Sequence, residues 1–225
     1  MTADPVRAIS VVVADDAALI RAGIVRLLDG GGFRVVAEAA HYDGLMAAVD
    51  ATVPDLVVTD IRMPPTNTDE GLRAAAAIRE AHPSVAVLVL SQHVEARGAS
   101  GLFDGRRAGI GYLLKERVSE LGEFLAAART VADGGSVVDP IVADQLLRRR
   151  RNDSALARLT ERERDVLRSM AQGKANAAIA TMLHLSGKTV ESHVRSIFDK
   201  LDLGDNNPDD NRRVLAVIRW LDATP

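Results

Sequence analysis

Residues 9–16 of the 225-residue chain read Ile-Ser-Val-Val-Val-Ala-Asp-Asp, an apolar run that ends in two carboxylates. Four further short apolar runs follow it, at residues 33–37, 56–59, 85–90 and 110–114. Their length and their β-branched residues are typical of strands that are buried on both faces of a parallel sheet. The sequence therefore predicts five parallel strands.

Amphipathic stretches with helical spacing separate these runs. Strands and helices that alternate in this order are typical of a doubly wound α/β fold, in which right-handed crossovers place helices on both faces of the sheet. We therefore expect residues 1–134 to form an α/β domain with an open, parallel, five-stranded sheet. The expected helices cover residues 18–28, 44–50, 70–81, 95–106 and 118–133.

The pattern changes after Gly134 and Gly135, which are typical of the end of a helix. Residues 135–157 are predicted to form a linker with a short helix near 142–149. Residues 158–225 contain no strand pattern, and we expect them to form a small all-α domain. Its expected helices cover residues 161–172, 176–183, 188–201 and 210–221.

The composition excludes several classes of protein. Hydrophobic residues make up 47% of the chain and charged residues 26%, which suits a soluble protein with a packed core. The absence of cysteine excludes disulfides and thiolate-bound zinc. No apolar run of about 18 residues is present and the N-terminus lacks a signal-peptide pattern, so we expect a cytoplasmic protein without a membrane partner.

Polar residues follow the ends of four expected strands. Asp15 and Asp16 follow the first, Asp60 the third, Ser91 the fourth and Lys115 the fifth. Because ligands of open α/β sheets bind beyond the carboxyl ends of the strands, we expect these side chains to converge. Clustered carboxylates without histidine or cysteine suit Mg²⁺, and a carboxylate beside such an ion can attack phosphorus. A lysine and a hydroxyl would then contact the phosphoryl oxygens.

Two alternatives remain open for this cluster at the level of the residues. Asp15 or Asp16 alone is equally well explained as the N-cap of the following helix. The set as a whole also suits a Mg²⁺-dependent phosphotransferase that passes through an aspartyl phosphate, although such an enzyme has no use for the helical domain.

The segments that carry these residues resemble a response-regulator receiver domain. They are Ala14-Asp15-Asp16, Thr59 to Pro65 (Thr-Asp-Ile-Arg-Met-Pro-Pro), Leu90-Ser91 and Gly111-Tyr112-Leu113-Leu114-Lys115. The resemblance implies that Asp60 is the phosphoacceptor and that Lys115 contacts the phosphoryl group. It also implies that Asp16, Asp60 and the Arg62 carbonyl bind Mg²⁺, with Asp15 assisting through water.

The same resemblance implies a switch pair formed by Ser91 and Tyr112. In that scheme the Ser91 hydroxyl moves to the phosphoryl group and Tyr112 turns inward. One position departs from the common receiver pattern, because Glu116 stands where many receivers have proline after the lysine.

The helical domain contains one helix with two different faces. Val190, Val194, Ile197 and Leu201 recur at the spacing of a buried stripe, and the opposite face carries Lys188, Ser192 and Arg195. A helix of this kind can enter the major groove of DNA, but an ordinary solvated amphipathic helix has the same pattern.

The surrounding residues resemble a LuxR-type helix-turn-helix domain of the NarL/FixJ class. The resemblance is carried by Leu159 to Glu163, Gly173 to Asn176, Ile179-Ala180 and Thr189 to His193. It implies a support helix at 176–183 and a recognition helix at 188–201. The DNA-binding residues expected from it are Lys174, Asn176, Lys188, Thr189, Glu191, Ser192, Arg195 and Lys200, of which Glu191 stands where this class often has a basic residue.

The last expected helix carries apolar residues on one side. The class uses this helix as a dimer interface, while a role in the small core alone fits the same pattern. The residues concerned are Val214, Val217, Ile218 and Leu221.

Together these resemblances imply a two-component response regulator that is not an enzyme, apart from autophosphorylation from small donors and autodephosphorylation. Its implied partners are a cognate histidine kinase, double-stranded promoter DNA, a second copy of the chain on that DNA and, if it is an activator, RNA polymerase. A DNA-binding regulator whose receiver works without phosphorylation is the alternative.

Overall fold

The computed structural model describes residues 7–94, 102–103, 109–203 and 211–223. It divides into two compact units, Met1–Leu146 and Leu147–Pro225, which are considered separately. The helix expected at 95–106 falls outside the described residues, apart from Leu102 and Phe103.

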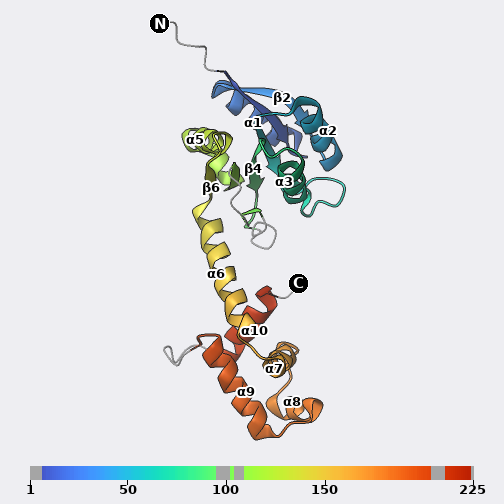
Figure 1. Ribbon diagram of the computed structural model, residues 1–225, viewed down its shortest axis with the longest axis vertical. Helices are drawn as coiled ribbons and strands as arrows, with labels where there is room; N and C mark the ends of the chain where they lie inside the picture. Colours follow the sequence, from blue (N-terminus) through green and yellow to red (C-terminus); the bar gives the residue numbers. More distant parts are fainter. Residues whose placement is uncertain (1–6, 95–101, 104–108, 204–210, 224–225) are drawn as a thin grey trace. The chain divides into compact units, whose positions relative to one another are not determined.

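The first unit is built on a parallel sheet (Figure 1) with the strand order β2-β1-β3-β4-β5-β6. The prediction of a parallel α/β sheet is confirmed, but the count of five strands was wrong by one, because Ser136–Val138 pairs with β5. This short strand lay in the expected linker, and a three-residue run gives too weak a pattern to be recognised. The strands are β1 (Ile9–Ala14), β2 (Phe33–Ala39), β3 (Leu56–Asp60), β4 (Ala86–Ser91), β5 (Ile110–Leu114) and β6 (Ser136–Val138).

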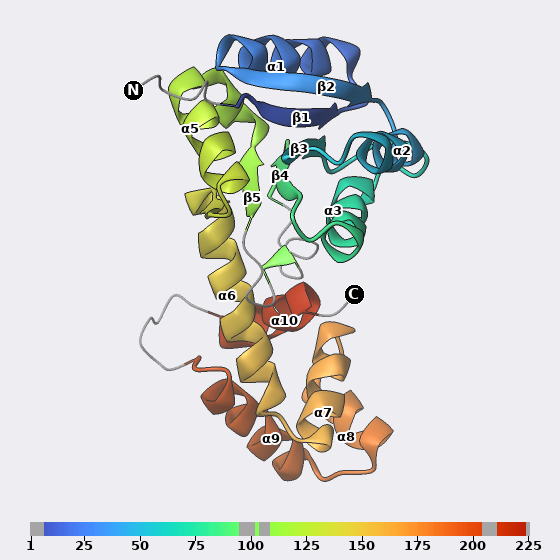
Figure 2. The same ribbon diagram turned by 45° about the horizontal axis from the view of Figure 1, so that its top comes forward.

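Helices cover both faces of the sheet, as the alternating pattern predicts (Figure 2). Helices α2 (Tyr42–Thr52) and α3 (Glu70–Ala81) pack on one face with strand residues such as Val57. Helices α1 (Ala18–Gly30) and α5 (Leu121–Ala132) pack on the other face. Successive residues of a strand point to opposite faces, so strands β1, β3 and β4 are apolar throughout, apart from polar residues at their ends.

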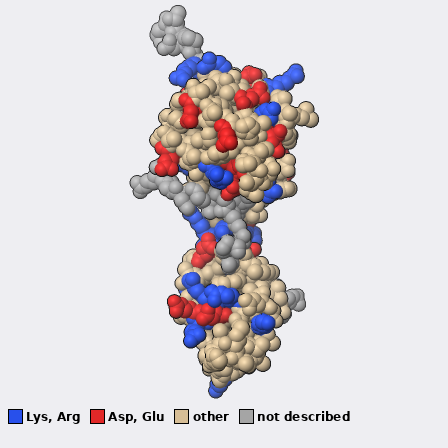
Figure 3. Space-filling view, turned by 90° about the vertical axis from the view of Figure 1, so that its right-hand side faces the viewer, with Lys and Arg blue, Asp and Glu red and all other residues tan. Residues whose placement is uncertain are grey.

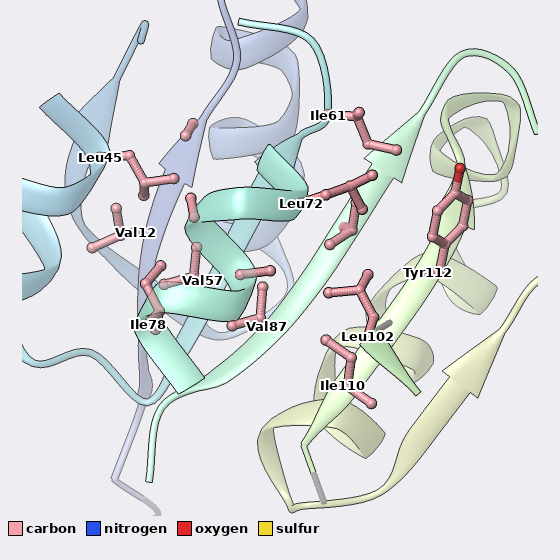
Figure 4. Packing of buried hydrophobic residues seen from close by; sticks show 14 of the residues in the cluster. Val12, Leu45, Val57, Ile61, Leu72, Ile78, Val87, Leu102, Ile110 and Tyr112 are labelled. Atoms are coloured by element: carbon pink, nitrogen blue, oxygen red, sulfur yellow. The ribbon is translucent and has the colours of Figure 1, made fainter. Parts of the chain in front are cut away.

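The core beneath α3 reaches the last strands of the sheet. In Figure 4, Leu72 and Ile78 of α3 lie over the strand residues Val57 and Val87. Tyr112 of β5 belongs to the same cluster and its side chain is fully buried. The packing that fixes α3 is therefore continuous with the packing around Tyr112.

The segment expected to be a linker is more ordered than the sequence indicated. Instead of a short helix near 142–149, the structure has α6 over Pro140–Ala157. Asp139 caps it by accepting a hydrogen bond from the amide of Ile141 at 3.0 Å, and Pro140 occupies the first helical position, where proline is favoured. Val142 anchors the start of α6 because it is buried in the core beneath α3.

The second unit is all-α, as expected, and has its own apolar core. Val190, Ile197 and Leu201 of the predicted stripe are fully buried, and Val194 is partly buried against the same core. Among the described residues, no helix has the length and the apolar character that a membrane span requires. The helices are α7 (Glu161–Ala171), α8 (Asn176–Leu183), α9 (Gly187–Lys200) and α10 (Arg212–Ala223).

Replacing Asp139 by alanine tests the anchoring of α6. Asp139 is fully buried, and it also accepts a hydrogen bond from the Arg117 guanidinium at 3.0 Å. Loss of an N-cap costs about 1 kcal/mol, so the amides of Ile141 and Ala143 should exchange hydrogen several-fold faster in Asp139→Ala. Hydrogen exchange of residues 136–150, followed by mass spectrometry, measures this. The exposed Gln145→Ala on the same helix is the control, and equal exchange in both variants would contradict the assignment.

Candidate phosphoryl and DNA sites

The polar residues at the strand ends meet at one edge of the sheet. Strands β1, β3, β4 and β5 are neighbours in the sheet and run parallel, so their carboxyl ends lie side by side. Asp15 and Asp16 follow β1, and Asp60 and Ser91 end β3 and β4. Lys115 begins a 3-10 turn, η2 (Lys115–Ser119), directly after β5.

Three carboxylates and one ammonium form the centre of this site. Oxygen atoms of Asp15, Asp16 and Asp60 all lie within 4.8 Å of one another. Asp15 is fully buried, Asp60 is 7% exposed and Asp16 is exposed. The Lys115 Nζ atom lies 2.7 Å from Asp15 Oδ2 and 3.0 Å from Asp60 Oδ2. The lysine thus offsets part of the repulsion between two buried carboxylates.

The donor set fits a hard divalent cation. Asp15 Oδ1 accepts a hydrogen bond from the amide of Ala17 at 2.9 Å. Its buried Oδ2 atom receives no hydrogen bond in good geometry from the described residues and has only the ion-pair contact with Lys115. Closely spaced carboxylate oxygens, one of them without a full set of partners, are what Mg²⁺ binds in proteins.

The electrostatics of the site follow from burial. Burial raises the pKa of Asp60 above its ordinary value, the charge of Asp15 raises it further, and Lys115 opposes both effects. Burial acts to lower the pKa of Lys115, but its attraction to Asp15 and Asp60 outweighs burial, and that pKa lies above its ordinary value. Lys115 therefore stays protonated at neutral pH, and a cation bound here would favour the ionised form of Asp60.

A cavity of about 200 Å³ opens beside Asp60. The sequence did not point to Asn67, Gln92 or His93 as site residues, although the two latter follow Ser91 directly along the chain. Asn67 lies in the loop between β3 and α3, which carries only the turn signals of proline, threonine and asparagine. The lining residues are Asp16, Asp60, Arg62, Asn67, Ser91, Gln92 and His93.

Ser91 and Tyr112 are brought together through His93. The Ser91 hydroxyl donates to the His93 carbonyl and accepts a hydrogen bond from the His93 amide at 3.2 Å. The Tyr112 hydroxyl donates to the same carbonyl at 3.3 Å. The resemblance implied a ring that turns inward, and here the ring is already inward because it packs in the core beneath α3.

In the second unit, α8 and α9 form a helix-turn-helix. His184 ends α8 in the left-handed conformation, and the Ser186 hydroxyl caps α9 by accepting a hydrogen bond from the Thr189 amide at 3.1 Å. The expected DNA-binding residues that are exposed are Lys174, Lys188, Glu191, Ser192 and Arg195. On the face of this unit shown in Figure 3, Lys and Arg side chains lie next to Asp and Glu side chains.

Three other expected DNA-binding residues have partners inside the unit. The Lys200 Nζ atom lies 2.7 Å from Glu163 Oε2 and 2.9 Å from Glu163 Oε1, so this ammonium joins α9 to α7. The Asn176 amide oxygen accepts a hydrogen bond from Arg213 at 2.8 Å, and the Thr189 hydroxyl lies 2.7 Å from that of Ser186. The sequence pattern of α9 could not reveal the pairing of Lys200, because its partner Glu163 lies on another helix, α7.

The apolar residues expected at a dimer interface divide into two groups. Val214, Ile218 and Leu221 are 50%, 47% and 54% exposed and share one side of α10. Val217 is partly buried against the core of the unit, so it contributes to packing there.

The fold and the site define a response regulator that binds DNA. Residues 11–124 match the family model of the response regulator receiver domain, and residues 157–207 match that of the luxR family of bacterial regulatory proteins. The chain is 31% identical to the transcriptional regulatory protein DegU of Brevibacillus brevis and 34% identical to the probable transcriptional regulatory protein NarL of Mycobacterium tuberculosis. Each alignment covers 88% of this chain and 89% of the relative.

A solved structure supports the same assignment. It describes RcsB from Salmonella enterica serovar Typhimurium bound to a promoter in the presence of the phosphate mimic BeF₃⁻. The similarity has a TM-score of 0.54 and 26% identity, and it covers 96% of this chain and 98% of that one. The chain belongs to the two-component response regulators of the NarL/FixJ class, with a receiver domain and a LuxR-type DNA-binding domain. The predicted fold class and family are confirmed.

The Glu163 carboxylate makes the stability of the second unit sensitive to acid. Burial acts to raise the pKa of Glu163, but hydrogen bonds from Lys200, Ser196 and Thr160 lower it from 4.5 to about 2. Because the folded pKa lies below the unfolded one, this stabilisation is complete above pH ~4.5 and is lost as the pH falls towards ~2. Glu163→Gln should lower the free energy of unfolding at pH 7 by about 2–3 kcal/mol and remove that acid dependence.

Urea unfolding between pH 7 and pH 3, followed by the fluorescence of Trp220, measures this effect in the second unit alone, because the chain has no other tryptophan. The exposed Glu161→Gln on the same helix is the control. An acid dependence that persists in Glu163→Gln would assign it to another group.

Proposed function

We propose that Asp60 is the phosphoacceptor of this response regulator and that its phosphorylation controls binding to DNA. The observation that carries the proposal is the position of Asp60. It lines an open cavity, Lys115 contacts it at 3.0 Å, and two further carboxylates lie beside it. The proposed Mg²⁺ ligands are Asp16, Asp60 and the Arg62 carbonyl, with Asp15 assisting through water.

The transfer step is a displacement at phosphorus. An oxygen of the Asp60 carboxylate forms a bond to the phosphorus of a kinase phosphohistidine. The phosphorus–nitrogen bond breaks, and the imidazole leaves with the bonding electron pair. Lys115, which carries its charge, neutralises the phosphoryl oxygens, and the Ser91 hydroxyl can donate to them once it leaves the His93 carbonyl. A Mg²⁺ ion bound to the carboxylates would supply additional positive charge for the transferred group.

The switch acts through the hydrogen bonds at His93. When the Ser91 hydroxyl moves to the phosphoryl group, the His93 carbonyl loses one of its donors among the described residues and keeps the Tyr112 hydroxyl. We infer that the backbone around His93 then shifts relative to Tyr112. Phosphoryl charge that changes the balance between two arrangements is a known kind of switch.

DNA binding is assigned to α9 as the recognition helix. Exposed Lys188, Ser192 and Arg195 face solvent and are proposed to reach base edges or phosphates. Lys200 is omitted from the proposed contacts because Glu163 binds its ammonium. The exposed apolar stripe of α10, Val214, Ile218 and Leu221, is proposed to join two copies of the chain on two half-sites.

The remaining partners follow from the class. We propose a cognate histidine kinase as the phosphoryl donor, promoter DNA as the target and, for an activator, RNA polymerase as a further contact. A protein that binds promoters in bacteria acts in the cytoplasm. We propose no enzymatic activity on a separate substrate, since the only chemistry assigned to the chain is phosphorylation and dephosphorylation of its own Asp60.

Phosphorylation of Asp60 is tested with a small donor. Intact-mass measurement after incubation with acetyl phosphate and Mg²⁺ should show one phosphoryl adduct on the unmodified chain and none on Asp60→Asn. The exposed Asp43→Asn, which removes the same charge outside the site, should take the adduct. An adduct on Asp60→Asn would place the acceptor elsewhere. If no protein took an adduct, either a kinase would be the sole donor or the regulator would work without phosphorylation.

The role of α9 is tested with Arg195→Ala. If Arg195 contacts a guanine with both nitrogens, its loss should weaken binding to the operator by about 1–3 kcal/mol, which is roughly 5- to 150-fold. Fluorescence anisotropy with labelled operator DNA at fixed salt measures this. The exposed Arg26→Ala removes the same charge from the first unit and should bind normally. Equal affinity of both variants would remove Arg195 from the interface.

A further inference from the structure

Glu70 is a buried carboxylate that the phosphoryl chemistry does not use. It stands at the first position of α3 and has no exposed surface. Its Oε1 atom accepts hydrogen bonds from the Thr66 amide at 3.0 Å and from the Thr66 hydroxyl, and Oε2 accepts one from the Thr68 amide at 2.9 Å. Both oxygens are therefore directed back at the loop that precedes the helix.

The hydrogen bonds hold this loop in a defined shape. Between the two residues that Glu70 contacts lies Asn67, which has a left-handed backbone with φ of 57°. The Asn67 amide donates to the Met63 carbonyl at 3.0 Å, and Asn67 lines the cavity beside Asp60. Glu70 thus fixes Thr66 and Thr68. Asn67, between them, is hydrogen-bonded to Met63, which lies three residues after the end of β3.

A second contact ties the start of α3 to the same segment. The Gly71 amide donates to the Ile61 carbonyl at 2.8 Å. A Cβ atom at position 71 would lie 1.9 Å from the Asp60 carbonyl oxygen, so only glycine permits this approach. The carbonyls of Ile61 and Met63, on either side of Arg62, therefore both accept hydrogen bonds from the segment that Glu70 organises.

The charge of Glu70 strengthens this arrangement. Burial acts to raise the pKa of Glu70, but the hydrogen bonds from Thr66 and Thr68 outweigh it and lower that pKa from 4.5 to about 2. The carboxylate is ionised at neutral pH, so its hydrogen bonds are charge-assisted and stronger than those between neutral groups. Its place in the first turn of α3 is also favourable for a negative charge.

We propose that Glu70 is a positioning residue for the cation site, since it holds residues 61–63 so that the Arg62 carbonyl stands beside Asp60 for Mg²⁺ binding. The inference rests on the proposed function, because the Arg62 carbonyl is a ligand only if the cluster of carboxylates binds Mg²⁺. Groups that orient the ligands of a metal typically affect its affinity by 10- to 100-fold. The other role that the contacts allow is support of α3 alone, which would affect the stability of the fold and leave the affinity for Mg²⁺ unchanged.

The experiment compares Glu70→Gln with Glu80→Gln in the full-length chain. Both remove one negative charge from α3, but Glu80 is exposed at the far end of that helix. Isothermal titration with MgCl₂ gives the dissociation constant of each protein. Glu70→Gln should bind Mg²⁺ about tenfold more weakly, because the NH₂ group of glutamine cannot accept the hydrogen bonds that one carboxylate oxygen accepts. Glu80→Gln should have the same dissociation constant as the unmodified chain. Hydrogen exchange of residues 61–71 should be faster in Glu70→Gln alone.

A kinetic measurement distinguishes weaker Mg²⁺ binding in Glu70→Gln from loss of the phosphoacceptor in Asp60→Asn. The rate of phosphorylation by acetyl phosphate should be low in Glu70→Gln at limiting Mg²⁺ and return to the normal rate when Mg²⁺ is raised about tenfold further. Asp60→Asn should show no such recovery. A Glu70→Gln protein whose rate stays low at saturating Mg²⁺ would overturn the proposed role.

Mg²⁺ binding by the unmodified chain separates the role of Glu70 from the existence of the cation site. If the unmodified chain binds Mg²⁺ and both glutamine variants bind it equally well, the role of Glu70 is overturned and the site stands. If the unmodified chain binds no Mg²⁺, the cation site and the role of Glu70 both fail. Should Glu70→Gln not fold, Thr66→Val removes one donor to the carboxylate at an exposed position, and an unchanged Mg²⁺ affinity in that variant would overturn the inference.

Discussion

The ion pairs of Lys115 with Asp15 and Asp60 require a particular arrangement of strands in the receiver unit. Two buried carboxylates in close proximity repel one another, and the ammonium between them reduces that cost. Asp15 and Lys115 follow β1 and β5, and Asp60 ends β3, so the three groups meet only if these strands run parallel with their carboxyl ends at one edge. The order β2-β1-β3-β4-β5-β6 satisfies this requirement, and apolar clusters pack on both faces of the sheet that carries these residues.

The same strand ends connect the site to the helix that leads towards the second unit. Lys115 begins η2, and Arg117 in that turn pairs with the buried Asp139 at 3.0 Å. The Asp139 amide donates to the Tyr112 carbonyl at 2.8 Å, while the Asp139 carboxylate caps α6. Asp139 at the start of α6 therefore contacts Tyr112 directly, and through Arg117 it contacts the turn that begins with Lys115. A movement of β5 or η2 would therefore act on the group that anchors this helix.

The sequence predicts features that depend on neighbouring residues of one element, and it does not predict features that depend on contacts between elements. The strands β1, β3 and β4 are apolar runs that end in or are followed by polar residues, so their positions and these polar residues could be read directly from the sequence. Strand β6 and the length of α6 could not, since both depend on the contact with β5 and on Asp139. The pairing of Lys200 with Glu163 was missed for the same reason, because a charge on α9 finds its partner on α7. Patterns along one element show which face is buried but not which charge on another element will meet it.

In each unit a buried glutamate accepts hydrogen bonds from backbone amides at the start of a helix. The first amides of a helix and of the loop before it have no partners within the helix. Glu70 accepts hydrogen bonds from the loop before α3, and Glu163 accepts them from Thr160 at the start of α7, at 2.7 Å from the amide. A carboxylate has two oxygens with several lone pairs, so one buried side chain can satisfy two or three donors at once. Glu163 directs its remaining capacity to Lys200 and joins two helices, whereas Glu70 directs both oxygens to a loop that borders a cavity. The two glutamates thus share the same chemistry but hold different parts of the structure. Glu163 has a structural role in the DNA-binding unit, whereas we assign Glu70 a positioning role in the receiver.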